Sequence, residues 1–193
     1  PSFGLDDTPT PPSPWTSEQA GNYYISASGC SDGRTYGYPG ASRCTIPSSP
    51  AAGSKIWLNG TYSSNLTANW SGTSGSPIWI LSYNPESKAT YSGEMVLSGD
   101  YIYVVNVAFS ASTNVMLLTM SGEKVTARSC TFANTYNDSN GALIYFNGSY
   151  VLVDGCTFSQ NGIWDTDSET DIDRHGIKTG PGDHYWIVRS TFY

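Results

Sequence analysis

The sequence predicts an all-β fold of the parallel β-solenoid type, and three observations lead to this prediction. First, four segments in the second half of the chain open with Gly, continue with a short strand-like run and end on Phe. Second, another short apolar run precedes each segment, so each repeat is expected to hold two strands. Third, no stretch shows helical periodicity, and only 13% of the residues are charged. Repeats of roughly 20 to 50 residues indicate a solenoid.

The four repeats differ in length but keep their first and last residues. They are GDYIYVVNVAF (99–109), GEKVTARSCTF (122–132), GSYVLVDGCTF (148–158) and GDHYWIVRSTF (182–192). The apolar runs before them are Glu94–Leu97, Val115–Thr119, Leu143–Phe146 and Gly176–Lys178. Because neighbouring strands lie about 4.8 Å apart, a solenoid of about six coils would be about 30 Å long.

The first half of the chain adds an arm and further strands. Residues 1–21 carry four prolines between positions 9 and 14, which predicts an extended, polyproline-like arm. Residues 22–193 are expected to form one β-helix domain. Its first strands are predicted at Asn22–Ala27, Lys55–Tyr62 and Pro77–Tyr83.

Charge and hydropathy exclude several classes of protein. The net charge is −7, and the stretch Asp165–Asp173 is its most acidic part. No basic face for nucleic acid is expected. No apolar run approaches the roughly 18 residues of a membrane helix, so no membrane span is expected. A start at Pro1 fits a processed, mature N-terminus.

Glycosylation motifs favour a secreted, extracellular glycoprotein. Asn-x-Ser/Thr motifs accept N-linked glycans on surface loops of secreted proteins. The five candidate acceptors are Asn59, Asn65, Asn69, Asn137 and Asn147.

The four cysteines form two pairs. Cys30 and Cys44 bracket a loop rich in Gly, Tyr and Pro, which predicts a disulfide in a secreted chain. Cys130 and Cys156 hold the same position in adjacent repeats, two residues before the Phe. A second disulfide and a buried pair of thiols are both compatible with this spacing.

One region resembles a known superfamily. The string YYISASGCSDGR, followed by TIPSSPAAGSKIWLNGTY, lies within residues 23–62. It resembles the N-terminal part of right-handed parallel β-helix proteins of the pectate-lyase-like superfamily. The resemblance implies a right-handed parallel β-helix. It does not choose a function, because this fold is shared by lyases, hydrolases, adhesins and spike proteins.

The chain departs from that superfamily at both ends. Thr45–Gly53 is the only room for the usual N-terminal capping helix, and Pro47 and Pro50 oppose a helix there. The last repeat closes at Phe192 with no capping element after it. We therefore expect uncapped ends with exposed strand edges, which favour end-to-end association.

The longest loop between repeats is a candidate cation site. Alternating carboxylates can converge on Ca²⁺, although the spacing does not match an EF-hand loop. The competing interpretation is a solvated acidic loop. The candidate ligands are Asp165, Asp167, Glu169, Asp171 and Asp173.

Lys178, Arg189 and His175 are the candidate catalytic residues. Superfamily lyases often use Lys or Arg as a base and Ca²⁺ to neutralise the carboxylate of a uronic acid. Lys178 and Arg189, together with a cation site at Asp171–Asp173, would resemble that arrangement. The alternative is that Lys178 is a surface strand residue and His175 a turn residue. A hydrolase would need carboxylates on successive coils, and the repeats that hold Asp154 and Arg189 supply no second one.

Aromatic residues are abundant, with fourteen Tyr, six Trp and six Phe. The repeat Phe residues are expected in the core. Trp57 and Trp79 are expected to stack one coil apart. A further group is expected in loops, where the rings either pack locally or bind sugars and partners: Tyr36, Tyr38, Tyr62, Tyr91, Tyr136 and Trp70.

Two functions remain open. The first is a secreted structural subunit that assembles end to end into a filament or surface layer, with itself as partner through stacking and exchange of the arm. The second is a carbohydrate-active protein, either a polysaccharide lyase or a glycan-binding fragment. The weak catalytic signals favour the first, non-enzymatic function.

Overall fold

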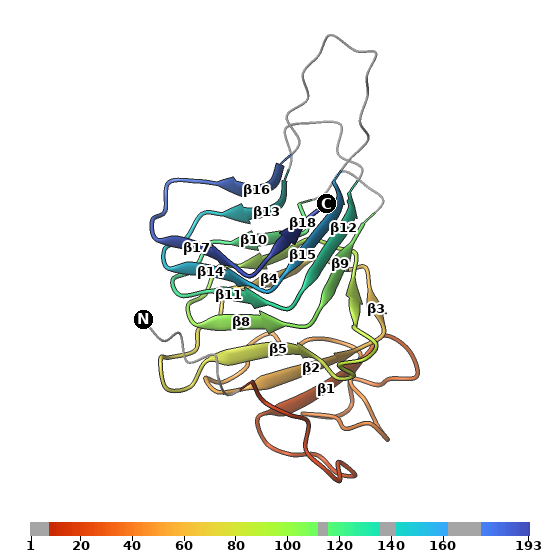
Figure 1. The fold of residues 1–193 in the computed structure, drawn as a ribbon. Helices are drawn as coiled ribbons and strands as arrows, with labels where there is room; N and C mark the ends of the chain where they lie inside the picture. The colour runs from red at the N-terminus through yellow and green to blue at the C-terminus, as the bar shows by residue number, and fades with distance from the viewer. Residues whose placement is uncertain (1–7, 112–115, 136–141, 162–174) are drawn as a thin grey trace.

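The computed structural model describes residues 8–111, 116–135, 142–161 and 175–193. These residues contain no helix, and their strands form three parallel sheets (Figure 1). The seven-stranded sheet contains, in spatial order, β1 (Asn22–Ser26), β2 (Lys55–Asn59), β5 (Ile78–Ser82), β8 (Ile102–Val105), β11 (Thr126–Arg128), β14 (Val151–Asp154) and β17 (Tyr185–Val188). The six-stranded sheet contains β3 (Thr61–Tyr62), β6 (Thr90–Tyr91), β9 (Ala108–Ser110), β12 (Thr131–Thr135), β15 (Thr157–Asn161) and β18 (Thr191–Phe192). The five-stranded sheet contains β4 (Leu66–Ala68), β7 (Met95–Leu97), β10 (Leu118–Met120), β13 (Ala142–Phe146) and β16 (His175–Thr179).

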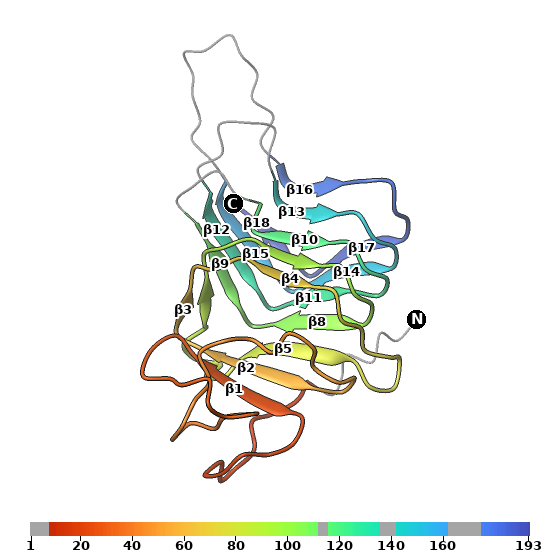
Figure 2. The ribbon, with the colours of Figure 1, turned by 180° about the vertical axis from the view of Figure 1, so that it is seen from behind.

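The chain visits the three sheets in a fixed order. It passes from β13 to β14 to β15, and β16, β17 and β18 repeat this order in the next layer, as seen from behind in Figure 2. All strand pairs within the sheets are parallel and one coil apart. This is the arrangement of a parallel β-solenoid, as the sequence predicted. The Gly-to-Phe segment was wrongly interpreted as one strand, because it contains two strands joined by a sharp corner.

The glycine that opens each repeat lies where successive coils come closest. A Cβ built on Gly122 would overlap the backbone carbonyl of Gly99, and one on Gly148 would overlap that of Gly122. The same relation joins Gly182 to Gly148 and Gly99 to Trp70. A larger residue at these positions would force the coils apart, so the repeat requires glycine.

The phenylalanine that ends each repeat forms a stack inside the solenoid. The rings of Phe109, Phe132, Phe158 and Phe192 lie with centroids 4.6 to 5.0 Å apart and planes within 4° to 11°. The expected core position is therefore confirmed for the buried members of the stack. Tyr62 and Tyr91 hold the same register in β3 and β6, so their assignment to loops was wrong.

The four coils that contain β8, β11, β14 and β17 also have two corners each with left-handed backbone. Between the five- and seven-stranded sheets, φ lies between 53° and 57°; we call this series the ladder column, and it comprises Tyr101, Lys124, Tyr150 and His184. Between the seven- and six-stranded sheets, φ lies between 51° and 61°; we call this series the groove column, and it comprises Asn106, Ser129, Gly155 and Arg189. Because non-glycine residues adopt this conformation at a cost, the corners are fixed by the stacking of the coils around them.

The seven-stranded sheet is buried on both faces over most of its strands, with β17 at its end as the exception. Its inner face contributes Ile56, Val104 and Val153 to the main core. Its outer face contributes Trp57 and Leu152 to a second buried cluster, which also contains Trp15 of the N-terminal segment. Strands buried on both faces are near-continuously apolar, as these are.

The predicted stack of Trp57 on Trp79 is wrong. The register pairs Trp57 with Leu81 and Trp79 with Lys55. Trp79 instead meets Tyr103 edge to face at 5.0 Å, and Trp57 meets Trp15 at 6.3 Å. The offset of two residues between β2 and β5 separates the two tryptophans.

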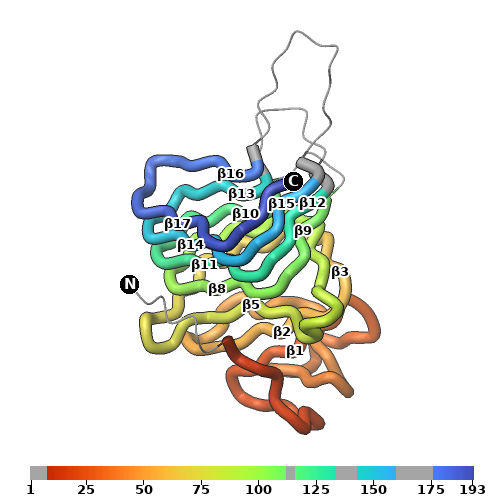
Figure 3. Tube along the Cα trace, in the orientation of Figure 1, coloured from red at the N-terminus to blue at the C-terminus, as the bar shows by residue number. Residues whose placement is uncertain are grey.

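The two ends of the seven-stranded sheet differ, as the tube in Figure 3 shows. At β1, the amide of Tyr24 donates to the Tyr36 carbonyl and the amide of Ser26 donates to the Arg43 carbonyl. At β17, Ile187 is exposed. The prediction of two uncapped ends is therefore wrong for β1, because the loop closed by the disulfide covers its edge. No described residues form a helix long and apolar enough to cross a membrane.

Candidate anion-binding groove

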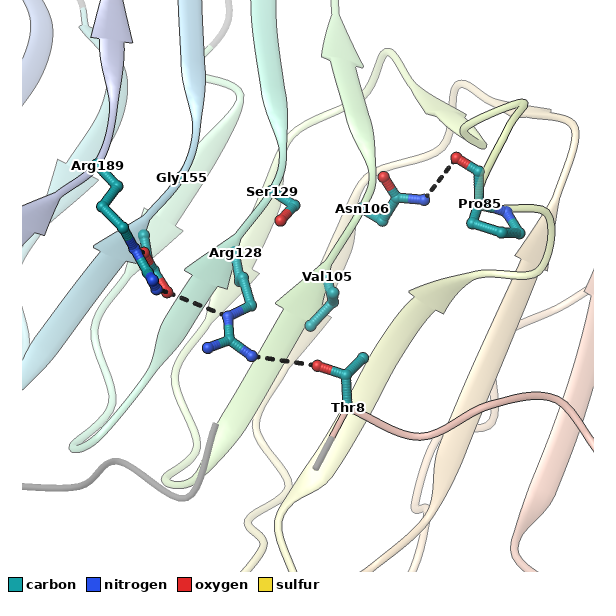
Figure 4. A pocket seen from close by; sticks show the side chains of 9 residues that line it. Thr8, Pro85, Val105, Asn106, Arg128, Ser129, Gly155 and Arg189 are labelled. Carbon is teal, nitrogen blue, oxygen red and sulfur yellow. Dashed lines mark hydrogen bonds and ion pairs between the residues drawn. The ribbon is translucent and has the colours of Figure 1, made fainter. Parts of the chain in front are cut away.

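An open groove of about 540 Å³ runs beside the groove column (Figure 4). Its floor comes from the ends of β8, β11 and β14, and its rim from the corner residues that follow them. The lining residues are Thr8, Pro85, Val105, Asn106, Arg128, Ser129, Asp154, Gly155 and Arg189.

Asp154 and two arginines form the charged centre of the groove. The Arg128 Nε lies 3.1 Å from Oδ2 of Asp154, and the Arg189 Nε lies 2.8 Å from Oδ1. Arg189 makes a second contact through Nη2. The Asp154 side chain is 2% exposed, whereas that of Arg189 is 72% exposed. The hydrogen bonds from Arg189, and then those from Arg128, hold the pKa of Asp154 below its usual range against the opposing effect of burial.

The repeat explains how these side chains come together. Asp154 ends β14 and lies in register with Arg128 at the end of β11. Arg189 follows β17, one coil further on, in a left-handed corner residue. The corner turns its side chain back toward the neighbouring coil, where it meets Asp154.

Among the described residues, the groove is lined by two arginines, Arg128 and Arg189, and one carboxylate, Asp154, in a chain whose net charge is −7. Lys88 lies beside the groove and donates to the Ser129 carbonyl at 2.6 Å. Guanidinium groups pair with carboxylate, sulfate and phosphate, so the arrangement is suited to bind an anionic group.

The structure separates the predicted catalytic residues. Lys178 is an exposed residue of β16 in the five-stranded sheet, and His175 begins the same strand. Arg189 lies beyond β17, at the opposite corner of the coil. Of the three, only Arg189 lines the groove. The strand β17 lies between Lys178 and Arg189, and the cation site that was expected beside them, Asp171–Asp173, lies outside the described residues.

The predicted cation site cannot be located. Asp165, Asp167, Glu169, Asp171 and Asp173 lie outside the described residues. Among the residues that are described, no three His, Cys, Asp or Glu side chains gather as metal ligands.

The cysteine predictions have two outcomes. Cys30 and Cys44 form a disulfide, as predicted, with Cα atoms 5.0 Å apart. Cys130 and Cys156 are buried free thiols. Contact with Cys130, together with burial, raises the pKa of the Cys156 thiol.

Four of the five predicted glycan acceptors are exposed. Asn59, Asn65, Asn69 and Asn147 lie at the surface, and Asn137 is outside the described residues. The Asn65 side-chain oxygen accepts a hydrogen bond from the Glu94 amide at 2.9 Å. Attachment of glycans stays a prediction.

The ladder column forms a second constellation that the sequence did not reveal. Lys124 lies 5.0 Å above the Tyr101 ring and 5.7 Å from the Tyr150 ring. The His184 ring stacks on Tyr150 at 4.7 Å. The hydrogen bond to Tyr101, followed by the contact with Glu123, raises the pKa of Lys124.

Thr8 was also missed as a groove residue. Its hydroxyl lies 3.2 Å from Nη1 of Arg128, 120 positions away in the chain. Counting residues back from each Phe would have aligned Asp154 with Arg128. No such signal exists for Thr8, which lies outside the repeats.

No known family model, curated protein or solved structure matches this chain. The resemblance of residues 23–62 to the pectate-lyase-like superfamily thus stays a prediction.

Proposed function

We propose that this chain is a secreted, right-handed parallel β-helix of about six coils that binds acidic carbohydrate through the groove at Arg128, Asp154 and Arg189. The observation that carries the proposal is the exposed guanidinium of Arg189, oriented by a buried carboxylate at the edge of a preformed groove. The disulfide Cys30–Cys44 supports an extracellular location.

The groove suits a carboxylated sugar better than a neutral one. Asp154 fixes the Arg189 side chain in place, which reduces the conformational entropy that an exposed arginine would lose on binding. Asn106, Ser129 and Thr8 add polar groups around the two guanidiniums. Uronic acids offer a carboxylate for arginine and hydroxyls for these neighbours.

The same geometry supports binding rather than hydrolysis. Asp154 is held ionised between two arginines and lies against the floor of the groove. A glycosidase uses a pair of carboxyl groups, one of them protonated as a general acid. No other carboxylate lines this groove in the described part of the chain.

The test is a titration of the protein with polygalacturonate and with its methyl ester. Both polymers share one backbone, but the ester lacks the free carboxylate. We expect saturable binding of the acid form, weakened by salt, and little binding of the ester. Equal affinity for the two polymers would contradict the proposal.

A matched pair of variants locates the binding site. Arg189→Met removes the exposed guanidinium and is expected to reduce affinity about tenfold, which corresponds to about 1.4 kcal/mol. Arg34→Met removes the same charge from the loop beside β1, where Arg34 lies over the Tyr38 ring. This control is expected to bind as the wild type does.

A second candidate is self-association through the β17 end. The observation that favours it is the exposure of Ile187, Val188 and Phe192 on the last described strands. The covered edge of β1 limits strand addition at the other end of this sheet. The geometry therefore favours pairs of copies joined at β17 over the filament predicted from sequence.

Sedimentation over a range of concentrations tests this second candidate. We expect concentration-dependent dimers for the wild type and monomers for Ile187→Lys. Electron microscopy of the same samples checks for fibres. A wild type that stays monomeric at high concentration would exclude both forms of assembly.

A further inference from the structure

Residues 8–13 lie on the protein with the three-residue periodicity of a polyproline II helix. Residues 8, 9, 11 and 12 are partly buried, and residues 10 and 13 are exposed. The chain then bends at residues 13 and 14, where Pro14 is exposed, and continues to the buried Trp15. A polyproline II helix has three residues per turn, so residues three apart share a face. The prolines at positions 9, 11 and 12 thus face the protein, and Thr10 and Ser13 face solvent.

The surface beneath this segment is one column of the outer face of the seven-stranded sheet. Successive strands place one residue each in this column: Tyr24, Trp57, Leu81, Val105 and Arg128. Trp15 meets the ring of Tyr24 at 5.5 Å and that of Trp57 at 6.3 Å. Thr8 contacts Arg128 at the other end of the column.

The Thr8–Trp15 segment, which we call the strap, is long enough to cross this column in an extended conformation. From β2 to β11 there are three strand spacings, about 14 Å in all. The five steps from residue 8 to residue 13 reach about 16 Å as polyproline II, and two further residues lead around the bend to Trp15, whereas an α-helix over all seven steps reaches only about 10 Å. The segment therefore crosses β8 and β5 in an extended conformation.

Aromatic side chains supply the main contacts of this interface. The centre of the Tyr83 ring lies 6.1 Å from that of Trp15 and 4.8 Å from that of Tyr24. Three aromatic residues, Tyr24, Trp57 and Tyr83, therefore surround the Trp15 ring. Aromatic surfaces recognise proline-rich segments because polyproline II is preformed and loses little entropy on binding. The contacts between the strap and the column are made by side chains, and no backbone pairing with the sheet fixes the strap to its own chain.

We propose that the column Tyr24–Trp57–Leu81–Val105–Arg128 is a binding site for proline-rich segments in the polyproline II conformation. The Thr8–Trp15 segment of the same chain occupies it. The proposal needs no anion, although the column shares Val105 and Arg128 with the groove.

The probe is a fluorescent peptide with the sequence TPTPPSPWTS, added to the full-length Trp15→Ala variant. Loss of Trp15 weakens the internal strap and leaves the column accessible. We expect saturable binding of the peptide to this variant. We expect at least tenfold weaker apparent binding to the wild type, whose own strap competes at a millimolar effective concentration.

A second peptide tests the ligand class, with every proline replaced by alanine. It keeps the tryptophan but loses the preformed conformation, and it should bind at least tenfold more weakly. Equal binding of the two peptides would overturn the assignment to polyproline II. Failure of the first peptide to bind a folded Trp15→Ala chain would overturn the site itself.

A second variant guards against loss of folding in Trp15→Ala. Pro11→Gly with Pro12→Gly loosens the strap while keeping its tryptophan and the whole sheet. It should bind the peptide more tightly than the wild type does.

Discussion

The two corner columns share a backbone conformation but differ in chemistry. Both place one left-handed residue per coil, with φ between 51° and 61°. In the ladder column the side chains stack on one another, as Lys124 does between Tyr101 and Tyr150. In the groove column they leave room, because Ser129 and Gly155 are small, and charged groups gather beside them. The solenoid thus repeats a position, and the residue type decides whether that position packs or binds.

The largest expected difference in stability between the two columns comes from replacing Asp154, which lies beside the groove column. Asp154→Asn leaves Arg128 and Arg189 without their shared carboxylate, and we expect a loss of about 2 kcal/mol in the free energy of unfolding at pH 7. Urea titration measures this loss. No comparable loss is expected for Glu123→Gln, because Glu123 pairs with Lys124 at an exposed site of the ladder column.

The pH dependence of the Asp154 effect follows from its lowered pKa. An unfolded Asp titrates near pH 3.9. Because the folded-state pKa lies below this value, the stabilisation is present above about pH 4 and is lost as the pH falls through the folded-state pKa. The difference in stability between wild type and Asp154→Asn should therefore decrease as the pH falls below about 4. A constant difference from pH 7 to pH 2 would show that Asp154 acts by packing alone.

A smaller effect is expected when glycine is placed in each column. Glycine adopts left-handed backbone at no steric cost. Ser129→Gly should therefore be neutral or slightly stabilising. Tyr150→Gly loses its stack on His184 and its contact with Lys124, and should destabilise by about 1 kcal/mol. Thermal unfolding of the two variants checks this, and equal shifts would contradict the distinction between the columns.

The smallest effect is expected for Lys124→Met. The methionine keeps an apolar stem against the Tyr101 ring but removes the cation, so we expect only a slight loss of stability. Part of that loss should disappear in high salt, because Lys124 is partly exposed. Urea titration at low and high salt measures both losses, and a loss as large as that of Asp154→Asn would mean that the ladder column is a structural centre.

Part of the fold could be predicted because it depends on a repeating local constraint. Gly122 and Phe132 recur in equivalent places since the coils touch at one and stack at the other. Continuous apolar runs such as IWIL and IYVV are typical of strands buried on both faces. These runs were assigned to strands, but it was not inferred that their outer face is covered. The segment that covers the outer face of this sheet could not be predicted from the sequence, because Trp15, which contacts Trp57, lies outside the repeats.

The groove was harder to predict for two physical reasons. Its corner residues include Ser129 and Arg189, which carry no sequence signal for left-handed backbone. Its charged centre combines Asp154 with arginines from two other coils. The sequence therefore identified Arg189 as a candidate but not its contact with Asp154.

The most direct test of the central claim compares one cation from each column. Calorimetric titration with polygalacturonate is carried out on Arg189→Met and Lys124→Met, which remove the same charge from equivalent kinds of corner. Binding through the groove predicts about tenfold weaker affinity for Arg189→Met and unchanged affinity for Lys124→Met. Equal affinities for the two variants, whether reduced or unchanged, would contradict it.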